Sequence, residues 1–194
     1  MAMPTLTLDP TTSALVLIDL QRGIIGTPTA PHAAHDVVAR AAELAKRFRE
    51  RHALVVLVRV DPGRQGELVP RPATDVQRPP LAVPPDWTEL APELGRADGD
   101  VVITKHQPSA LYATDLEVHL RRRGVRTIVL GGISTNVGVE ATAREAYERG
   151  FEQVFVEDAM AAREADLHTH AVTRLFPTIG RVRSTKEVLA ALGE

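Results

Sequence analysis

Short apolar runs alternate along the chain with longer segments in which apolar residues recur at helical spacing. The runs predict strands at 14–18, 53–60, 101–104, 126–130 and 153–156, and a weak sixth at 181–183. The longer segments predict helices at 32–51, 115–123, 136–149, 166–175 and 186–192. A run as uniformly apolar as 14–18 is typical of a parallel strand covered on both faces. The pattern predicts an α/β fold, a three-layer α/β/α sandwich around a six-stranded, mainly parallel sheet.

One stretch breaks this alternation. Residues 61–99 hold eight of the fourteen prolines and have no clear periodicity. A connection of this length inside a compact domain is usually functional or mobile. Two compatible interpretations stay open: a surface arm that packs on a neighbouring subunit, or a lid or substrate wall that carries Arg64, Gln65, Arg71 and Arg78. The length of 194 residues fits one domain, 1–194, with this loop or arm as its irregular part.

Composition narrows the function classes. Twenty-three basic residues against 25 acidic ones give a net charge of −2, which argues against a dedicated nucleic-acid binder. The absence of cysteine excludes disulfides, thiolate metal sites and cysteine nucleophiles. The first residues lack the pattern of a secretory signal, and every apolar run is too short to span a bilayer. We therefore expect a cytoplasmic protein that binds neither nucleic acid nor membranes.

Three features follow predicted strands and so fall on one edge of the sheet. Asp19 follows the first strand, Lys105 follows the third, and the glycine-containing segment 131–138 follows the fourth. Each feature taken alone has an ordinary interpretation. Asp19 is then a turn or cap residue, Lys105 a solvated strand end, and the glycines of 131–138 a tight turn. The segment 131–138 matches neither a dinucleotide fingerprint nor a phosphate loop. Because ligands of open α/β sheets bind beyond the carboxyl ends of the strands, the convergence predicts a small-molecule site.

The histidines offer no evident metal site. His32 and His35 share a predicted helix face, and His168 and His170 bracket one residue, but neither pair has a third ligand at suitable spacing. Solvated helix histidines are the favoured interpretation of both pairs, so we expect no metal and no cofactor. His106 follows Lys105 at the mouth of the predicted site, where a structural role is favoured over a binding or proton-relay role.

Four segments carry a resemblance to a known family. The sequences LIDLQ at 17–21, ITKHQPSA at 103–110, GISTNVGVEATAR at 132–144 and VFVEDA at 154–159 resemble the isochorismatase-like hydrolases, in the same order and across nearly the whole chain outside 61–99. The resemblance implies strand order 3-2-1-4-5-6, homo-oligomers such as dimers or tetramers, and a cis peptide before Ser134. It also implies that Asp19 and Lys105 are catalytic. The position of the family's cysteine nucleophile holds Gly138 instead.

The missing thiol changes the chemistry that the resemblance implies. Most members are cysteine hydrolases that act on amides. Some of these bind a metal through Asp and His residues that follow the second strand. This chain has DPGR at 61–64 in that place and offers no histidine. Isochorismatases proper carry glycine at the nucleophile position and cleave a vinyl ether, with the aspartate as general acid and water completing the hydrolysis. Ser134 and Asn136, however, are closer to the cysteine branch, because isochorismatases proper have an aromatic residue and a histidine there. Ser134 and Thr135 are nearby hydroxyls, but no partnered histidine is evident.

Three hypotheses remain. The first is a cysteine-independent hydrolase in which Asp19 is the general acid or base, Lys105 its electrostatic partner, and the amides of 134–138 an anion cradle. Its expected substrate-binding residues are Gln21, His106, Ser134, Thr135, Asn136 and Gly138. The second is a catalytically inactive binding or scaffold homologue of a cysteine amidase. The third is a former amidase altered at Gly138, in which Gly138→Cys would create amide hydrolysis.

Overall fold

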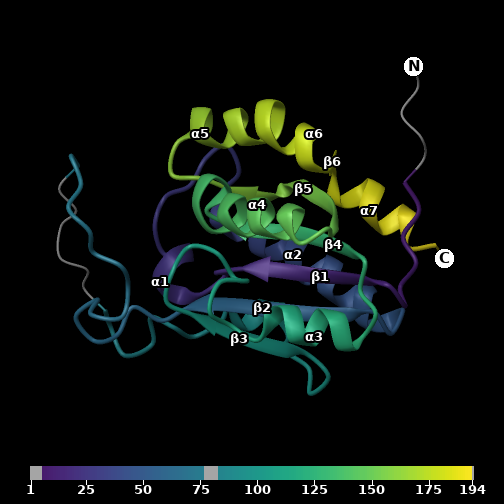
Figure 1. Cartoon of the computed structure of the whole chain (residues 1–194), viewed down its shortest axis with the longest axis horizontal. Helices are drawn as coiled ribbons and strands as arrows, with labels where there is room; N and C mark the ends of the chain where they lie inside the picture. The colour runs from purple at the N-terminus through teal and green to yellow at the C-terminus, as the bar shows by residue number, and fades with distance from the viewer. Residues whose placement is uncertain (1–5, 77–82, 194) are drawn as a thin grey trace.

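The computed structural model describes residues 6–76 and 83–193, and a twisted sheet runs through its centre (Figure 1). The strands are β1 (Ser13–Ile18), β2 (Leu54–Val60), β3 (Val101–Lys105), β4 (Thr127–Ile133), β5 (Glu152–Ala161) and β6 (Arg181–Arg183). Their order is β3-β2-β1-β4-β5-β6, and every neighbouring pair is parallel. The α/β fold and the strand order are therefore confirmed.

Helices cover both faces of the sheet. The helices are α1 (Arg22–Ile25), α2 (Ala34–Glu50), α3 (Leu116–Arg122), α4 (Glu140–Glu148), α5 (Ala165–His170), α6 (Phe176–Ile179) and α7 (Thr185–Ala191). Leu15 and Leu17 of β1 pack with α2 and α7 in one core cluster. Val16 and Ile18 pack with α3, α4 and α6 in the other. Alternate residues of one strand thus face opposite layers, as the three-layer sandwich requires.

Several boundaries differ from the sequence prediction. The helix expected at 136–149 begins with a π-helical turn, η2 (Thr135–Val139), and the one expected at 166–175 ends in another, η3 (Ala171–Leu175). His32 precedes α2 rather than lying on it. In the part of the chain that the structure describes, no helix has both the length and the apolar character needed to cross a membrane.

The β5 strand extends well beyond the predicted 153–156. Its register against β4 shifts: Leu130 pairs with Phe155, whereas Gly132 pairs with Met160. Residues 156–159 of β5 therefore lie opposite a single residue of β4. An extra stretch of this kind bends a strand and redirects its side chains.

The Pro-rich stretch 61–99 begins beyond the carboxyl ends of the strands, where residues 61–76 project at the left of Figure 1, and its last residues lie at the opposite end of the sheet. It contains one short 3-10 helix, η1 (Pro92–Leu94). Arg64, Gln65 and Arg71 are exposed, and Arg78 lies outside the described residues. Its later part is fixed to the segment that follows β1 by backbone bonds, which run from Arg22 N to Glu89 O (2.8 Å), from Gly23 N to Trp87 O (3.0 Å) and from Ala91 N to Leu20 O (2.9 Å).

Candidate active site

The structure brings Asp19 and Lys105 into direct contact. Asp19 follows β1 with a φ of 53°, and its amide donates to Val58 O of β2 (2.9 Å). Lys105 ends β3 and reaches over the intervening β2, so that its Nζ lies 2.9 Å from Asp19 Oδ2. The same ammonium donates to Pro108 O. Only 6% of Asp19 and 1% of Lys105 are exposed, so the ion pair is shielded from bulk water.

Burial dominates the electrostatics of Asp19. It raises the pKa of Asp19 to about 6, while the charge and the hydrogen bond of Lys105 act in the lowering direction. Asp19 Oδ1 is buried and has no hydrogen-bond partner among residues 6–76 and 83–193. One carboxyl oxygen is therefore held by the lysine and the other is free to carry a proton. Such a group can exchange a proton near neutral pH.

Gly138 lies beside this pair. A Cβ built on Gly138 would lie 3.0 Å from Asp19 Oδ2, 3.1 Å from Lys105 Nζ and 2.8 Å from Cγ2 of Ile18. Thr142 Oγ1 donates to Gly138 O (2.7 Å) and so fixes this turn of η2. The peptide between Ile133 and Ser134 is cis, as the resemblance implied. A side chain at 138 would thus point at both members of the ion pair, and glycine lets the backbone of η2 pack closely against them.

Comparison with known proteins decides the family. The model of the isochorismatase domain matches residues 13–187. This chain belongs to the isochorismatase family of hydrolases. It is 46% identical to the isochorismatase family protein YecD of Escherichia coli O157:H7 over 187 residues, covering 96% of this chain and all of that protein.

Two further relatives of this isochorismatase-family protein are informative. A solved structure of an isochorismatase family protein from Burkholderia thailandensis is 47% identical, with a TM-score of 0.92 over 98% of this chain and 100% of the other. The maleamate amidohydrolase of Pseudomonas putida is 34% identical over 190 residues, covering 92% of this chain and 86% of that protein. The family frame thus extends over nearly the whole chain.

Gln21 is a buried link at the edge of the site. Its Nε2 donates to Val60 O (3.0 Å) and to Trp87 O (3.2 Å), and its Oε1 accepts from Val60 N (2.8 Å). The side chain joins the ends of β1 and β2 to the anchored part of the 61–99 stretch. These bonds account for its burial in this isochorismatase-family protein, and its predicted contact with substrate stays a prediction.

Replacing Gln21 by Leu should destabilise the protein by about 3 kcal/mol, because Val60 and Trp87 would lose their partners and Leu supplies none. Gln65→Leu, on the exposed part of 61–99, is the matched control and should stay within about 0.5 kcal/mol. Urea unfolding measures both. Equal losses in the two variants would contradict this role for Gln21.

The remaining predicted residues lie around the site in different settings. His106 is exposed, and its Nδ1 lies 2.8 Å from Asp61 O, which gives it the structural contact that was favoured. Ser134 Oγ donates to Asn136 Oδ1 (3.2 Å) at the start of η2. Val137 N donates to Ser134 O (3.1 Å), so that amide is not free to join the predicted anion cradle.

The expectation that no histidine partners the hydroxyls is wrong. Thr135 Oγ1 lies 2.9 Å from His168 Nδ1, and both residues are buried. Burial lowers the pKa of His168, while its hydrogen bond to Glu157 acts in the opposite direction. Thr135 is fully buried, and its hydroxyl contacts His168 at the start of η2; its predicted contact with substrate stays a prediction.

The interpretation of both histidine pairs as solvated helix histidines is also wrong, because His32 and His168 each contact Glu157. His32 does not group with His35, nor His168 with His170; instead His32, Glu157 and His168 come together from three separate segments. His168 is buried, not solvated. Sequence spacing gave no signal for this cluster, because Glu157 lies 125 residues from His32 and 11 from His168.

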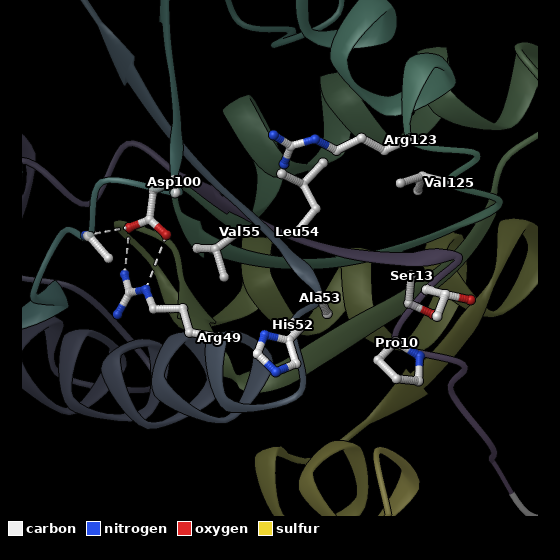
Figure 2. A pocket seen from close by; sticks show the side chains of 13 residues that line it. Pro10, Ser13, Arg49, His52, Ala53, Leu54, Val55, Asp100, Arg123 and Val125 are labelled. Atoms are coloured by element: carbon white, nitrogen blue, oxygen red, sulfur yellow. Dashed lines mark hydrogen bonds and ion pairs between the residues drawn. The ribbon is translucent and has the colours of Figure 1, made fainter.

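A hollow of about 420 Å³ lies at the opposite end of the sheet, by the first residues of β1 and β2 (Figure 2). Ser13, Leu54 and Arg123 line it, together with Arg49 and Asp100. Arg49 and Asp100 form an ion pair with one another, since Arg49 Nη2 lies 2.8 Å from Asp100 Oδ2. None of the predicted site residues lines this hollow, and ligands of parallel sheets bind at the other edge.

Proposed function

We propose that this chain hydrolyses a small molecule at the Asp19–Lys105 pair, with water in place of a thiol as the nucleophile. One observation carries the proposal: the missing side chain of Gly138 would point at both members of the pair. Acyl transfer through a covalent intermediate needs a nucleophile at that position, and glycine supplies none. A reaction in which the carboxyl group only transfers a proton needs no side-chain nucleophile at position 138.

Vinyl-ether hydrolysis fits this requirement. The carboxylic acid form of Asp19 gives its proton to the terminal carbon of the enol ether, which leaves an oxocarbenium ion. Water adds to the cationic carbon and returns a proton to the carboxylate, and the hemiketal then collapses to an alcohol and a ketone. The ammonium of Lys105, 2.9 Å from Oδ2, stabilises the carboxylate that forms after the first proton transfer.

A binding protein without turnover is the second candidate. The burial of the ion pair favours this candidate. Asp19 and Lys105 are almost fully buried, so a substrate reaches them only if the covering residues move. Such a protein would bind a small molecule through the same frame and leave it unchanged.

The experiment is product analysis by mass spectrometry after incubation with isochorismate and a panel of small amides that includes maleamate. We expect cleavage of a vinyl ether, with kcat/KM falling about tenfold per pH unit above about pH 6, since the reaction needs the protonated form of Asp19. A rate independent of pH between about 5 and about 8 would contradict the role of Asp19 as acid. Binding without any product would favour the second candidate.

The proposal extends to assembly. Leu68 and Val76 are large apolar side chains on the described part of 61–99, and both are exposed. Exposed apolar side chains mark a contact with another chain where they form part of a larger apolar patch. We propose that this arm packs on a second copy in a cytoplasmic homo-oligomer.

A further inference from the structure

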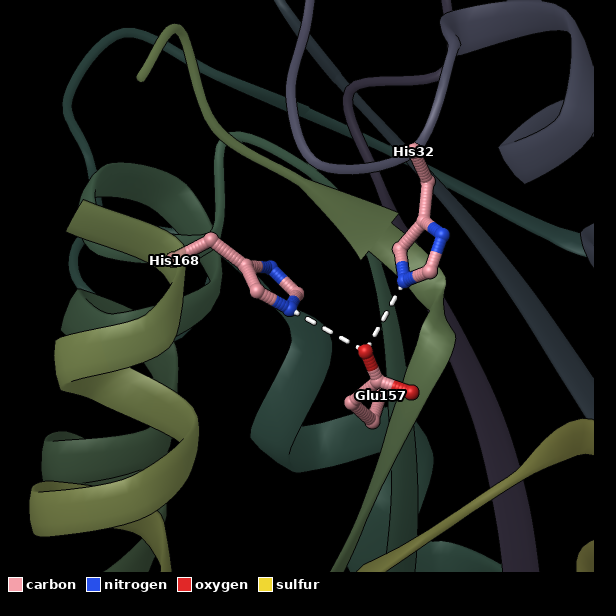
Figure 3. Close-up of side chains that lie close together, drawn as sticks. All are labelled: His32, Glu157 and His168. Carbon is pink, nitrogen blue, oxygen red and sulfur yellow. Dashed lines mark hydrogen bonds and ion pairs between the residues drawn. The ribbon is translucent and has the colours of Figure 1, made fainter. Parts of the chain in front are cut away.

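Three potential metal ligands converge from separate elements (Figure 3). His32 comes from the loop before α2, Glu157 from the irregular stretch of β5, and His168 from α5. Glu157 Oε1 lies 2.8 Å from His32 Nε2 and 3.4 Å from His168 Nε2. The three ligand atoms lie within 4.8 Å of one another.

We propose that His32, Glu157 and His168 form a binding site for a divalent transition-metal ion, with Zn²⁺ as the ion tested. Ligand atoms at zinc-bond lengths in a tetrahedral site lie about 3.3 Å apart, and the two measured separations fall on either side of that value. Two imidazoles and one carboxylate are a donor set for zinc and its neighbours. Calcium and magnesium prefer oxygen ligands throughout.

The surroundings of His168 support this assignment. Metal-bound histidines nearly always use their second nitrogen in a hydrogen bond that fixes the ring. Here Thr135 Oγ1 lies 2.9 Å from His168 Nδ1, which leaves Nε2 for the cluster. The rings of His32 and His168 lie edge to face, with centroids 5.7 Å apart. Figure 3 shows that both rings point toward the carboxylate of Glu157.

Burial is graded across the cluster. The side chain of His168 is 3% exposed, whereas those of His32 and Glu157 are 24% and 35% exposed. An ion can therefore reach the site from the solvent side. Three protein ligands leave a fourth tetrahedral position for water, as in zinc sites that stay open to a ligand.

The site does not depend on the proposed hydrolysis, because neither Asp19 nor Lys105 belongs to it. The two regions are nevertheless linked. Thr135 begins η2, and the same short turn carries Gly138 beside the ion pair.

The test is isothermal titration of the full chain, stripped with EDTA, with ZnCl₂, together with the visible spectrum of the Co²⁺ form. We expect one ion per chain and the ligand-field bands of a tetrahedral Co²⁺ site. His32→Ala and Glu157→Gln should both lose stoichiometric binding; because these side chains are partly exposed, both variants should fold, as circular dichroism in EDTA checks. His35→Ala is the matched control, since His35 is exposed and outside the cluster, and it should bind like the wild type.

Thr135→Val tests the orienting bond separately. It should weaken zinc binding about 10- to 100-fold without changing the number of ions bound. No stoichiometric binding by the wild type would overturn the proposal. Binding that persists unchanged in both His32→Ala and Glu157→Gln would overturn it as well, because the zinc would then be held elsewhere.

Discussion

Asp19→Asn is expected to lower turnover about 10²- to 10⁴-fold, the usual contribution of a general acid or base. The amide has nearly the shape of the carboxylic acid and still accepts a hydrogen bond from Lys105, but it cannot supply a proton. Asn is also suited to the backbone here, since Asp19 has a φ of 53° and asparagine tolerates that region better than most residues. The loss of rate should therefore reflect chemistry and not misfolding.

The matched control for this variant is Asp115→Asn, the same chemical change at an exposed position before α3. Rates are measured on whichever substrate of the panel yields product, and circular dichroism checks the fold. Full activity of folded Asp19→Asn would rule out acid catalysis by this carboxyl group. Equal losses in the two Asn variants would point to a defect unrelated to the site.

The same variant has a signature in stability. The pKa of Asp19 is about 6 in the folded chain against an ordinary value of 3.8, so the folded chain holds this proton more tightly than the unfolded one. Asp19 thus contributes about 3 kcal/mol below about pH 4, and this contribution is lost as the pH rises through about 6. Urea unfolding at about pH 4 and above about pH 6 should show that the free energy of unfolding of the wild type falls with rising pH, whereas that of Asp19→Asn does not. Parallel declines would mean that the carboxyl group titrates normally.

Gly132→Ala should leave the chain largely unfolded. Gly132 has a φ of 126°, and a Cβ there would lie 2.1 Å from the carbonyl oxygen and 2.6 Å from the amide nitrogen of Ile18. These are backbone atoms of β1, paired with β4 at this residue, so no rotamer change can relieve the contact. The cost should exceed about 4 kcal/mol, a large part of the stability of a typical domain.

Gly99→Ala is the control, because a Cβ there meets nothing within 4 Å. Its free energy of unfolding should stay within about 0.5 kcal/mol of the wild type. Expression, circular dichroism and urea unfolding compare the two variants. A Gly132→Ala protein as stable as Gly99→Ala would show that β1 and β4 separate there more easily than their pairing indicates.

The sheet and the ion pair were accessible from the sequence for a physical reason. Buried parallel strands read as short apolar runs, and a residue that directly follows such a run must lie at the carboxyl edge of the sheet. Asp19 and Lys105 each follow a run, and the strand order implied by the resemblance leaves one strand between theirs, a span that a lysine side chain covers. The bounds of β5 were less accessible, because its shift against β4 depends on pairing and not on composition.

The histidine cluster was inaccessible for the opposite reason. Spacing rules detect ligands on one helix or one loop, and they grouped His32 with His35 and His168 with His170. The actual cluster depends on the irregular stretch of β5, which carries Glu157 between the loop of His32 and the helix of His168. Thr135 and His168 likewise meet only through the packing of η2 against α5.

Both ends of the 61–99 stretch are fixed independently of what lies between them. Asp61 is held by Lys105 O and His106, and residues 86–91 are held by the chain just after Asp19. The residues that anchor the stretch are therefore neighbours in sequence of the two members of the ion pair. Substitutions at Arg64, Gln65 or Arg71, which lie between these anchors, should therefore leave the contact between Asp19 and Lys105 unchanged. Sequence changes between the two anchors can accumulate without rebuilding the frame that holds the ion pair.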